Sequence, residues 1–135
     1  MKKYFGACLV FLFFGTVFAF SQEVRYRFDP SDSNLSWGNQ VSYVTVNSMS
    51  HSVAINFYLT NGTYCTFQFN SPLQRDFTVA CDFDLYSPNA AGGRGLGTIR
   101  QMSLGLGSEE IYCAIYDSVA DRNAGRRSVW FSVKR

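Results

Sequence analysis

Arginine is the residue type in this sequence that is best suited to binding chemistry. Beyond residue 21 the chain has nine arginines but only one lysine, Lys134. A guanidinium group presents a rigid fork of N–H donors that matches carboxylate, phosphate and sulfate oxygens. Two segments that we expect to be loops, 86–97 and 118–127, carry four candidates: Arg94, Arg122, Arg126 and Arg127. The sequence therefore predicts that these arginines recognise an anionic glycan or a protein surface.

Few residues are suited to acid–base or metal chemistry. His51 is the only histidine, and Asp82 and Asp84 stand two residues apart on the polar side of an expected strand. Such a carboxylate pair is compatible with a small secreted hydrolase or toxin-like effector. The glycines of segment 92–97 lack the spacing of a nucleotide-binding loop, and no close set of histidines and cysteines indicates zinc. We therefore favour a binding protein over an enzyme and assign no catalytic residue, metal site or cofactor.

Aromatic residues fall into two groups by their position in the strand pattern. Most share the phase of the expected core, but Tyr112 and Tyr116 fall on the opposite phase, as do Tyr58, Tyr64 and Trp130. Exposed tyrosine and tryptophan rings beside polar side chains are typical of surfaces that bind carbohydrates or proteins. We add Tyr112 and Tyr116 to the candidate binding residues. The alternative is that another strand covers this face.

An alternation of apolar and polar residues with a period of two runs through most of the chain. It is strongest in segments 53–59, 65–69, 77–85, 102–106, 111–115 and 129–133, and weaker in 24–28 and 41–46. No segment has the pattern of a helix of ordinary length. The sequence predicts an all-β fold: an antiparallel β-sandwich or small closed barrel of about eight short strands, with mostly meander connections.

Two expected hairpins position the cysteines. A three-residue loop in the first pairs Phe57 with Cys65 and keeps one face apolar, whereas a two-residue turn would mix the faces. Pairing outward from the next loop sets Cys65 opposite Cys81, within the distance that a disulfide bond accepts. We prefer this bridge. Cys113 is then a free thiol, an alternative partner for Cys81, or a link between two copies of the chain.

A third hairpin joins the expected strands 102–106 and 111–115. We expect it to pair Leu106 with Ile111 and Leu104 with Cys113, which directs both leucines into the core. Meander connections place alternate loops at the same end of such a fold. The two arginine-bearing loops therefore share one end, where a rigid sheet usually carries its binding residues.

The N-terminal segment has the organisation of a secretory signal peptide. Lys2 and Lys3 precede an apolar run, and Ala19 and Ser21 occupy the −3 and −1 positions of a small-residue cleavage site. The run is shorter than the ~20 residues that cross a bilayer as a helix. We predict a cleaved signal peptide over residues 1–21, a single β domain without a transmembrane segment over residues 22–135, and a secreted or periplasmic location.

Cleavage changes the charge balance. The whole chain has 12 Lys and Arg against 10 Asp and Glu, and the two lost charges are Lys2 and Lys3, so the mature chain has ten of each. A formally neutral chain lacks the basic excess of a typical nucleic-acid-binding domain. We predict an exported binding domain with a protein or glycan partner and no nucleic-acid partner. The alternatives are the hydrolase and a structural surface protein that assembles through an edge strand or the odd cysteine.

Overall fold

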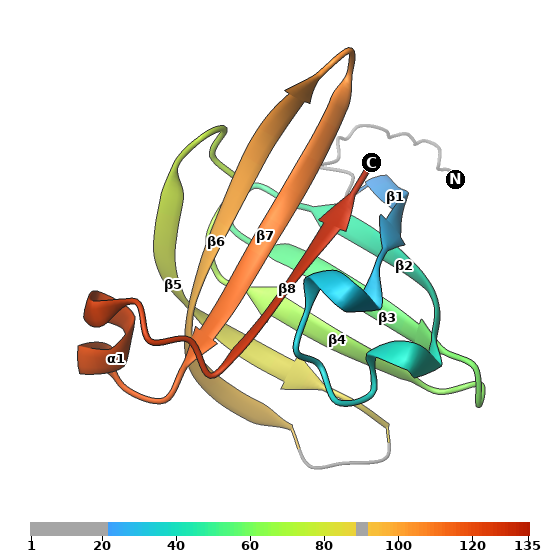
Figure 1. Cartoon of the computed structure of the whole chain (residues 1–135), viewed down its shortest axis with the longest axis horizontal. Helices are drawn as coiled ribbons and strands as arrows, with labels where there is room; N and C mark the ends of the chain where they lie inside the picture. The colour runs from blue at the N-terminus through green and yellow to red at the C-terminus, as the bar shows by residue number, and fades with distance from the viewer. Residues whose placement is uncertain (1–21, 89–91) are drawn as a thin grey trace, which may run out of the picture.

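The computed structural model describes residues 22–88 and 92–135. Within them, eight antiparallel strands close into a small barrel, with one short α-helix beside it (Figure 1). In chain order the elements are β1 (Gln22–Phe28), η1 (Pro30–Asp32), η2 (Gly38–Gln40), β2 (Val41–Ser48), β3 (Val53–Leu59), β4 (Tyr64–Phe69), β5 (Thr78–Tyr86), β6 (Gly93–Gly105), β7 (Ser108–Tyr116), α1 (Val119–Ala124) and β8 (Val129–Lys134). The predicted all-β fold is confirmed, in its closed-barrel form. The predicted signal peptide lies outside the described residues.

The strands follow one another around the barrel in the order of the sequence. Each strand pairs with the next, as a meander requires, and β8 closes the barrel on β1. That closing contact is short, because it pairs only Arg27 with Lys134 and Phe28 with Val133. The β1–β8 contact is therefore a seam, held by fewer backbone pairs than any other strand contact of the barrel.

The connection between β1 and β2 reinforces this seam and closes one end of the barrel. The side-chain oxygen of Asn34 accepts a hydrogen bond from the backbone N–H of Trp130 (2.7 Å), and its amide donates to the carbonyl of Ser128 (2.9 Å). Asn34 thus bonds to β8 where β1 does not reach. Three residues further on, Trp37 packs against the core.

Aromatic rings fill the interior. The ring of Phe57, which is fully buried, meets four others edge to face. The centroid distances are 5.1 Å to Phe131, 5.2 Å to Phe28, 5.3 Å to Trp37 and 5.8 Å to Phe67. The interior of an eight-stranded barrel is just wide enough for side chains to fill it. The apolar face of each strand is therefore satisfied by the rings of strands across the barrel.

Two glycines of β6 make room for these rings. A Cβ atom at Gly95 would lie 2.5 Å from Cε1 of Phe83, and one at Gly97 would lie 3.0 Å from Cε1 of Phe69. The prediction of a glycine-rich loop over residues 86–97 is wrong, because β5 continues to Tyr86 and β6 begins at Gly93. These glycines serve packing between a strand and the core, and Arg94 lies on a strand.

The predicted strand registers are right for one hairpin and wrong for the next. Phe57 pairs with Cys65, as the hydrophobic pattern predicted. Phe69, however, pairs with Phe83 instead of Phe77. A closed barrel requires staggered strands, so β4 pairs only with the last part of β5. The error of six residues is even, which leaves the same faces inward. Phe77 stays outside the core and is 67% exposed.

The same stagger removes the predicted Cys65–Cys81 disulfide bond. The backbone N–H of Asn70 bonds to the carbonyl of Asp82, so Cys81 lies six residues, about 20 Å, along the strand direction from Cys65. The alternative pair, Cys81 with Cys113, is separated by β6 and hence by two strand spacings, about 9.5 Å, beyond the reach of a disulfide. These three cysteines are free thiols.

Burial makes the thiols unreactive. It raises the pKa of Cys65 and of Cys81 to about 11, and the pKa of the fully buried Cys113 lies well above its ordinary value. The thiolate is the reactive form of cysteine. At neutral pH the three side chains therefore act as small apolar residues of the core.

The β6–β7 hairpin differs from the predicted one in its turn. A bulge before Gly105 precedes a two-residue turn that starts at Leu106. Ile99, and not Leu104, pairs with Cys113. The predicted pairing is wrong because the turn lies at Leu106 and Gly107 and not at residues 107–110, so Met102 already pairs with Glu110 before the bulge. Leu104 and Leu106 consequently lie in solvent instead of the core.

The segment predicted as a second loop, 118–127, contains α1. The side chain of Ser118 caps the helix by accepting a hydrogen bond from the N–H of Asp121 (3.0 Å), and Gly125 ends it in the left-handed conformation, with φ of 72°. The helix packs against β6 and β7. Across the described ranges, no helix has the length and apolar character needed to cross a bilayer.

Polar side chains gather at the end of the barrel opposite Trp37. The hydroxyl of Tyr26 donates a hydrogen bond to Glu109, which also accepts one from Nε2 of Gln101 (2.9 Å). Leu73 and Arg135 complete the lining of a hollow of about 430 Å³. Burial, together with the neighbouring Glu109, raises the pKa of Tyr26 above its ordinary value. The Glu109 carboxylate is therefore directed toward the barrel mouth.

Replacement of Gly95 by alanine should destabilise the fold. The new Cβ would overlap the Phe83 ring, and overpacking of a core typically costs about 1–3 kcal/mol. Urea unfolding followed by circular dichroism measures the change. Gly93→Ala is the matched control, because its Cβ would lie an ordinary 4.0 Å from Cβ of Leu85. Equal stability of the two variants would contradict the packing role of Gly95.

Alkylation tests the state of the cysteines. The chain from Gln22 onward should take up three iodoacetamide groups in denaturant without reductant, because Cys65, Cys81 and Cys113 are free. The folded protein at neutral pH should react slowly, because the thiol pKa values are raised. Intact mass measures both states. Uptake of a single group in denaturant would instead reveal a disulfide bond.

Candidate functional site

Two of the four predicted arginines are already paired with carboxylates. Nε of Arg94 lies 3.0 Å from Oδ1 of Asp84, and Nε of Arg126 lies 2.9 Å from Oδ1 of Asp121. Arg122 lies on α1. Exposed ion pairs contribute little to stability, but their carboxylates compete with an incoming anion for the same donors. Arg94 and Arg126 are therefore less available than the sequence predicted.

Arg127 joins the other predicted feature, the outer tyrosines. Its guanidinium lies over the ring of Trp130, 4.2 Å from the centroid, and Nη1 donates to the hydroxyl of Tyr112. The hydroxyl of Tyr116 lies 3.3 Å from Oγ1 of Thr98, within hydrogen-bond distance. Both tyrosines are half-buried on the outer face of β7. The structure thus brings Arg127 and Tyr112 together on one side of the barrel, close to α1.

The residues considered for acid–base chemistry are not assembled. His51 is exposed in the turn between β2 and β3. Asp84 accepts hydrogen bonds from Arg94 and from the Asn70 amide (3.2 Å), and Asp82 is exposed. Among the described residues, no three potential metal ligands lie together. The arrangement contains no general acid–base pair.

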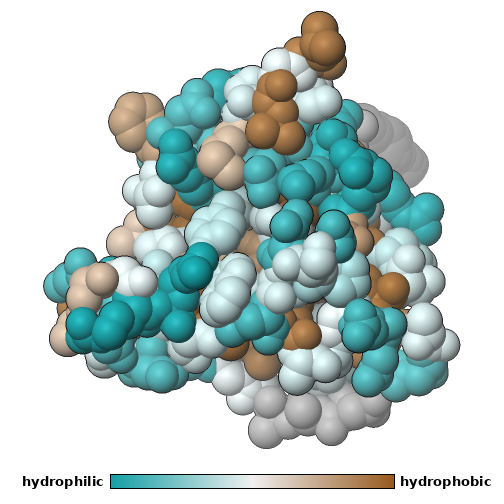
Figure 2. Space-filling view, in the orientation of Figure 1, coloured by the Kyte–Doolittle hydropathy of each residue, from teal (hydrophilic) through white to brown (hydrophobic). Residues whose placement is uncertain are grey.

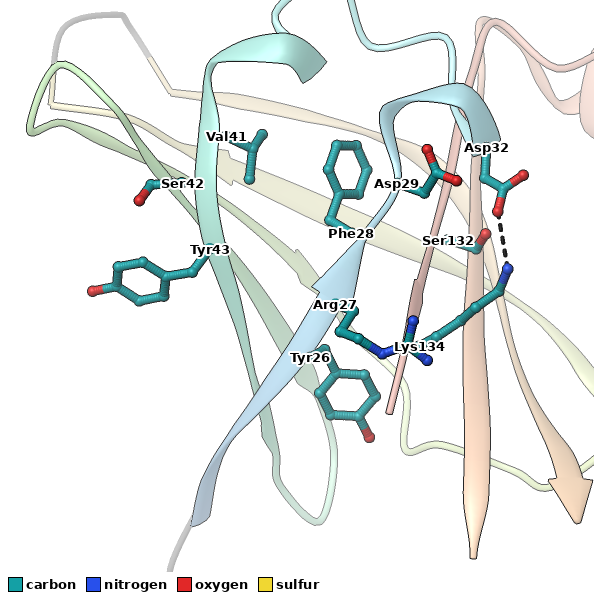
Figure 3. A pocket seen from close by; sticks show the side chains of 10 residues that line it. All are labelled: Tyr26, Arg27, Phe28, Asp29, Asp32, Val41, Ser42, Tyr43, Ser132 and Lys134. Carbon is teal, nitrogen blue, oxygen red and sulfur yellow. Dashed lines mark hydrogen bonds and ion pairs between the residues drawn. The ribbon is translucent and has the colours of Figure 1, made fainter. Parts of the chain in front are cut away.

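A pocket that the sequence did not predict lies at the seam of the barrel (Figure 3). β1 pairs with β2 as far as Tyr26 and then pairs with β8 through Arg27 and Phe28. The pairing of β2 with β3 is irregular between Val41 and Tyr43, and β1 and β2 separate at this point. The separation leaves a hollow of about 470 Å³. Side chains of β1, β2, β8 and the η1 segment surround it.

Arg27 is a cation of this pocket without a partner. Its neighbour across the seam, Lys134, places Nζ 2.9 Å from Oδ2 of Asp32, and this hydrogen bond raises the pKa of Lys134 (Figure 3). The carboxylate of Asp29 accepts hydrogen bonds from the N–H and the hydroxyl of Ser31 at 2.9 and 2.8 Å, which lower the pKa of Asp29. Both carboxylates are thus engaged, and no described residue bonds to the Arg27 guanidinium.

A column of tyrosines borders the pocket. Tyr43, on the pocket wall, stacks on Tyr58 with a centroid distance of 4.5 Å and an interplanar angle of 17°. Tyr64 follows at 6.4 Å from Tyr58, and the guanidinium of Arg25 covers the other side of Tyr43 at 4.0 Å. The column crosses the outer face from β1 to β4. The pocket therefore opens beside an aromatic surface.

A row of hydrogen-bonded polar side chains runs beside this column. Thr45 donates to Glu23, Nδ2 of Asn56 donates to Thr45 (3.2 Å), and Thr66 donates to Asn56 (2.7 Å). Each residue belongs to a different strand from β1 to β4. The mutual bonds orient the hydroxyl and amide groups, which gives this face a fixed polar pattern beside its rings.

Sequence reasoning missed this pocket because its walls come from separate segments. The segment from Asp29 to Gln40 matches neither a strand nor a helix pattern, so its carboxylates had no assigned position. One signal was available: Glu23, Arg25 and Arg27 alternate with the apolar residues of β1 and therefore share its outer face. That signal identifies a charged face but not the residue left without a partner.

Comparisons with known proteins add no family to this description. No protein-family model matches the chain, and no curated protein or solved structure matches it significantly. Small β-barrels carry unrelated functions, and function has to be argued from the site. The pocket at the seam and the Arg127–Tyr112 cluster are the two arrangements from which that argument starts.

Substitution of Asn34 by alanine should loosen the seam beside the pocket. It removes the bonds to Trp130 and Ser128, which together contribute about 1–2 kcal/mol. Hydrogen exchange of the Trp130 amide should accelerate, as measured by NMR. Asn39→Ala, in the same connection, is the control because Asn39 is exposed in η2. Unchanged exchange at Trp130 would mean that Asn34 does not hold the seam.

Proposed function

We propose that residues 22–135 form an exported binding domain whose pocket between β1, β2 and β8 takes the charged unit of an anionic saccharide. The observation that carries the proposal is the Arg27 guanidinium, which stands in a polar hollow with no partner among the described residues. A guanidinium fork bonds a carboxylate or sulfate through two parallel N–H donors. An anionic ligand would thus supply the partner that the fold leaves out.

The remainder of the pocket suits a sugar better than an apolar ligand. The hydroxyls of Ser42 and Ser132 and the ring of Tyr43 line it, with charged groups at its rim. A saccharide combines hydroxyl groups with C–H faces that pack on aromatic rings, so it uses both kinds of wall. The hollow of about 470 Å³ is within the size range of small-molecule sites.

The tyrosine column extends this preference beyond the pocket. Tyr43 and Tyr64 are 38% and 43% exposed, and the polar row from Glu23 to Thr66 runs parallel to them. A second sugar unit that leaves the pocket past Tyr43 would meet ring edges and oriented amide and hydroxyl groups. We therefore propose a short chain of sugars, with its charged unit at Arg27.

Export is part of this proposal. Residues 1–21 are proposed to be a cleaved signal peptide, which gives a secreted or periplasmic domain that meets extracellular saccharides. The intact mass of the purified exported protein tests this, since it should begin at Gln22. A mass that retains Met1 would reject the export of a processed chain.

Replacement of Arg27 by glutamine should weaken binding of anionic sugars at least tenfold. A charge-assisted hydrogen bond contributes about 1.5–3 kcal/mol, and glutamine keeps a polar amide but is shorter and uncharged. The probes are glucuronic acid and glucose 6-sulfate, with uncharged glucose as reference. Chemical-shift titration of the ¹⁵N-labelled protein measures affinity and maps the site. Added salt should weaken binding of both anionic probes.

Arg127→Gln is the matched control for this test. It removes the same charge from the neighbouring cluster on the outer face of β7 and β8, where Arg127 covers Trp130 outside the pocket lining, and should leave sugar binding unchanged. Loss of binding in Arg127→Gln alone would transfer the site to the arginine end. Absence of any shift with either anionic sugar would reject the saccharide proposal.

The arginine end predicted from the sequence is a second candidate, for a protein surface. Arg127 is held between Trp130 and Tyr112, and arginine, tyrosine and tryptophan are the residue types that dominate binding energy between proteins. Arg122, on the neighbouring helix α1, forms no ion pair with a described residue. This surface adjoins the pocket, because Tyr112 pairs across the strands with Ser132 of the pocket lining.

The hydrolase and assembly alternatives have less support. His51 forms no hydrogen bond with Asp82 or Asp84 in the described part of the chain. Cys113 is fully buried, so a disulfide between copies would have to use Cys65 or Cys81. Closure of the barrel also pairs both sides of most strands. Neither alternative has a residue as free and as well placed as Arg27.

A further inference from the structure

The hairpin of β6 and β7 extends past the rim of the barrel (Figure 1). The last residue of β6 that pairs with β5 is Arg100, and the first residue of β7 that pairs with β8 is Glu110. Beyond them Arg75 and Asp76 contact Gln101, and the N–H of Arg135 bonds to the carbonyl of Glu109. From Leu104 to Ser108 the two strands pair only with each other. The end of the hairpin is therefore a two-stranded projection that no neighbouring strand supports.

The residue at the end of this projection is unusual for its position. Leu106 and Gly107 form a two-residue turn in which both have positive φ, 54° and 77°. Such a turn favours asparagine followed by glycine, and a bulky residue with positive φ is a strained exception. Strained positions of this kind point to function when the surrounding structure maintains them. Leucine is unfavourable here for two reasons: it is strained at positive φ, and its apolar side chain is exposed to solvent.

Apolar side chains cluster around this leucine. Leu106 is fully exposed and Leu104 is 51% exposed. Phe77 lies at the base of the hairpin, because the N–H of its neighbour Asp76 bonds to the carbonyl of Gln101 (2.6 Å). Figure 2 shows hydrophobic side chains standing clear of the hydrophilic surface at this end of the molecule. Exposed apolar clusters of this kind mark interaction sites.

The projection carries no charge near its end. From Gln101 to Ser108 the chain has no charged residue. The first charged residue along β7 is Glu109, one strand residue past the turn, and its carboxylate is directed into the barrel mouth toward Tyr26. The Asp76 carboxylate lies at the same level, where it accepts a hydrogen bond from the N–H of Ser103 (3.5 Å). An uncharged depth of roughly 6 Å lies within the 5–10 Å to which interfacial protein segments enter a bilayer.

We infer that the β6–β7 hairpin inserts Leu104 and Leu106 into the interfacial region of a lipid bilayer and so holds the domain at a membrane surface. A convex end formed by leucine side chains enters a fluid surface without needing a matching pocket. A lipid bilayer is such a surface, whereas a folded protein would have to present a complementary pocket. Leucine is also under-represented among the residues that dominate protein interfaces, where aromatic residues and arginine prevail. Insertion stops in the interfacial region, where water still solvates the outward N–H and C=O groups of the two strands.

Cosedimentation with vesicles tests this inference. The protein from Gln22 onward is mixed with phosphatidylcholine vesicles, with and without phosphatidylglycerol, and the bound fraction is measured after centrifugation. We expect binding to both, because the inserted segment is uncharged. Leu106→Asn should reduce the partition coefficient about tenfold or more, while the asparagine–glycine turn that it creates keeps or raises the unfolding temperature.

A matched pair of variants separates the hairpin from general surface hydrophobicity. Leu104 and Val119 are both 51% exposed, one on the hairpin and one on α1. Leu104→Asn should weaken vesicle binding and Val119→Asn should not. Equal loss in both variants, or full binding by Leu106→Asn, would overturn the inference.

Two other results would also overturn it. One is a wild-type protein that remains in the supernatant with both kinds of vesicle. The other is self-association in analytical ultracentrifugation that Leu106→Asn abolishes, without vesicle binding, which would assign the hairpin to contact between copies of the chain.

Discussion

Closure of the sheet is the constraint on which the rest of this structure depends. Eight strands can meet edge to edge only if they are staggered, and the space that they enclose just accommodates side chains. The stagger directs β4 to the far half of β5, and it makes β1 exchange β2 for β8 part of the way along. Both surface features follow from the stagger. The pocket opens where β1 changes partner, and the hairpin projects where β5 begins and β8 ends.

The sequence predicted the properties of this barrel that depend on near neighbours along the chain. Alternation assigned an inner and an outer side to most strands, and the register of β3 and β4 followed because a slip of one residue would expose Phe57. A pattern of period two cannot distinguish registers that differ by two, four or six residues, so it could not find the offset of β4 and β5. The β6–β7 hairpin defeated the pattern in another way, because Met102 pairs with Glu110 on the outer face while Ile99 and Gln101 hold the inner phase of the strand.

The candidate site shows the same division between local and long-range information. Residue type and strand phase were sufficient to identify arginines and outer tyrosines, and Arg127 and Tyr112 are indeed in contact. Whether a charge is free depends on its neighbours in space. Asp84 neutralises Arg94 and Asp32 is bonded to Lys134, so Arg27 is left as the unpaired cation of the pocket, and no sequence motif distinguishes it.

The short seam couples the pocket to the integrity of the whole ring. Arg27 and Lys134 come from opposite ends of the described chain, so their contact closes the longest loop in the fold and carries the largest entropic cost of closure. A ligand held between β1, β2 and β8 binds only the closed ring, and mass action then shifts the balance away from the opened form. Ligand concentration would accordingly govern how often the ring opens, and with it the rate at which proteases reach the backbone. In such a molecule, higher occupancy of the site would lengthen the lifetime of the protein.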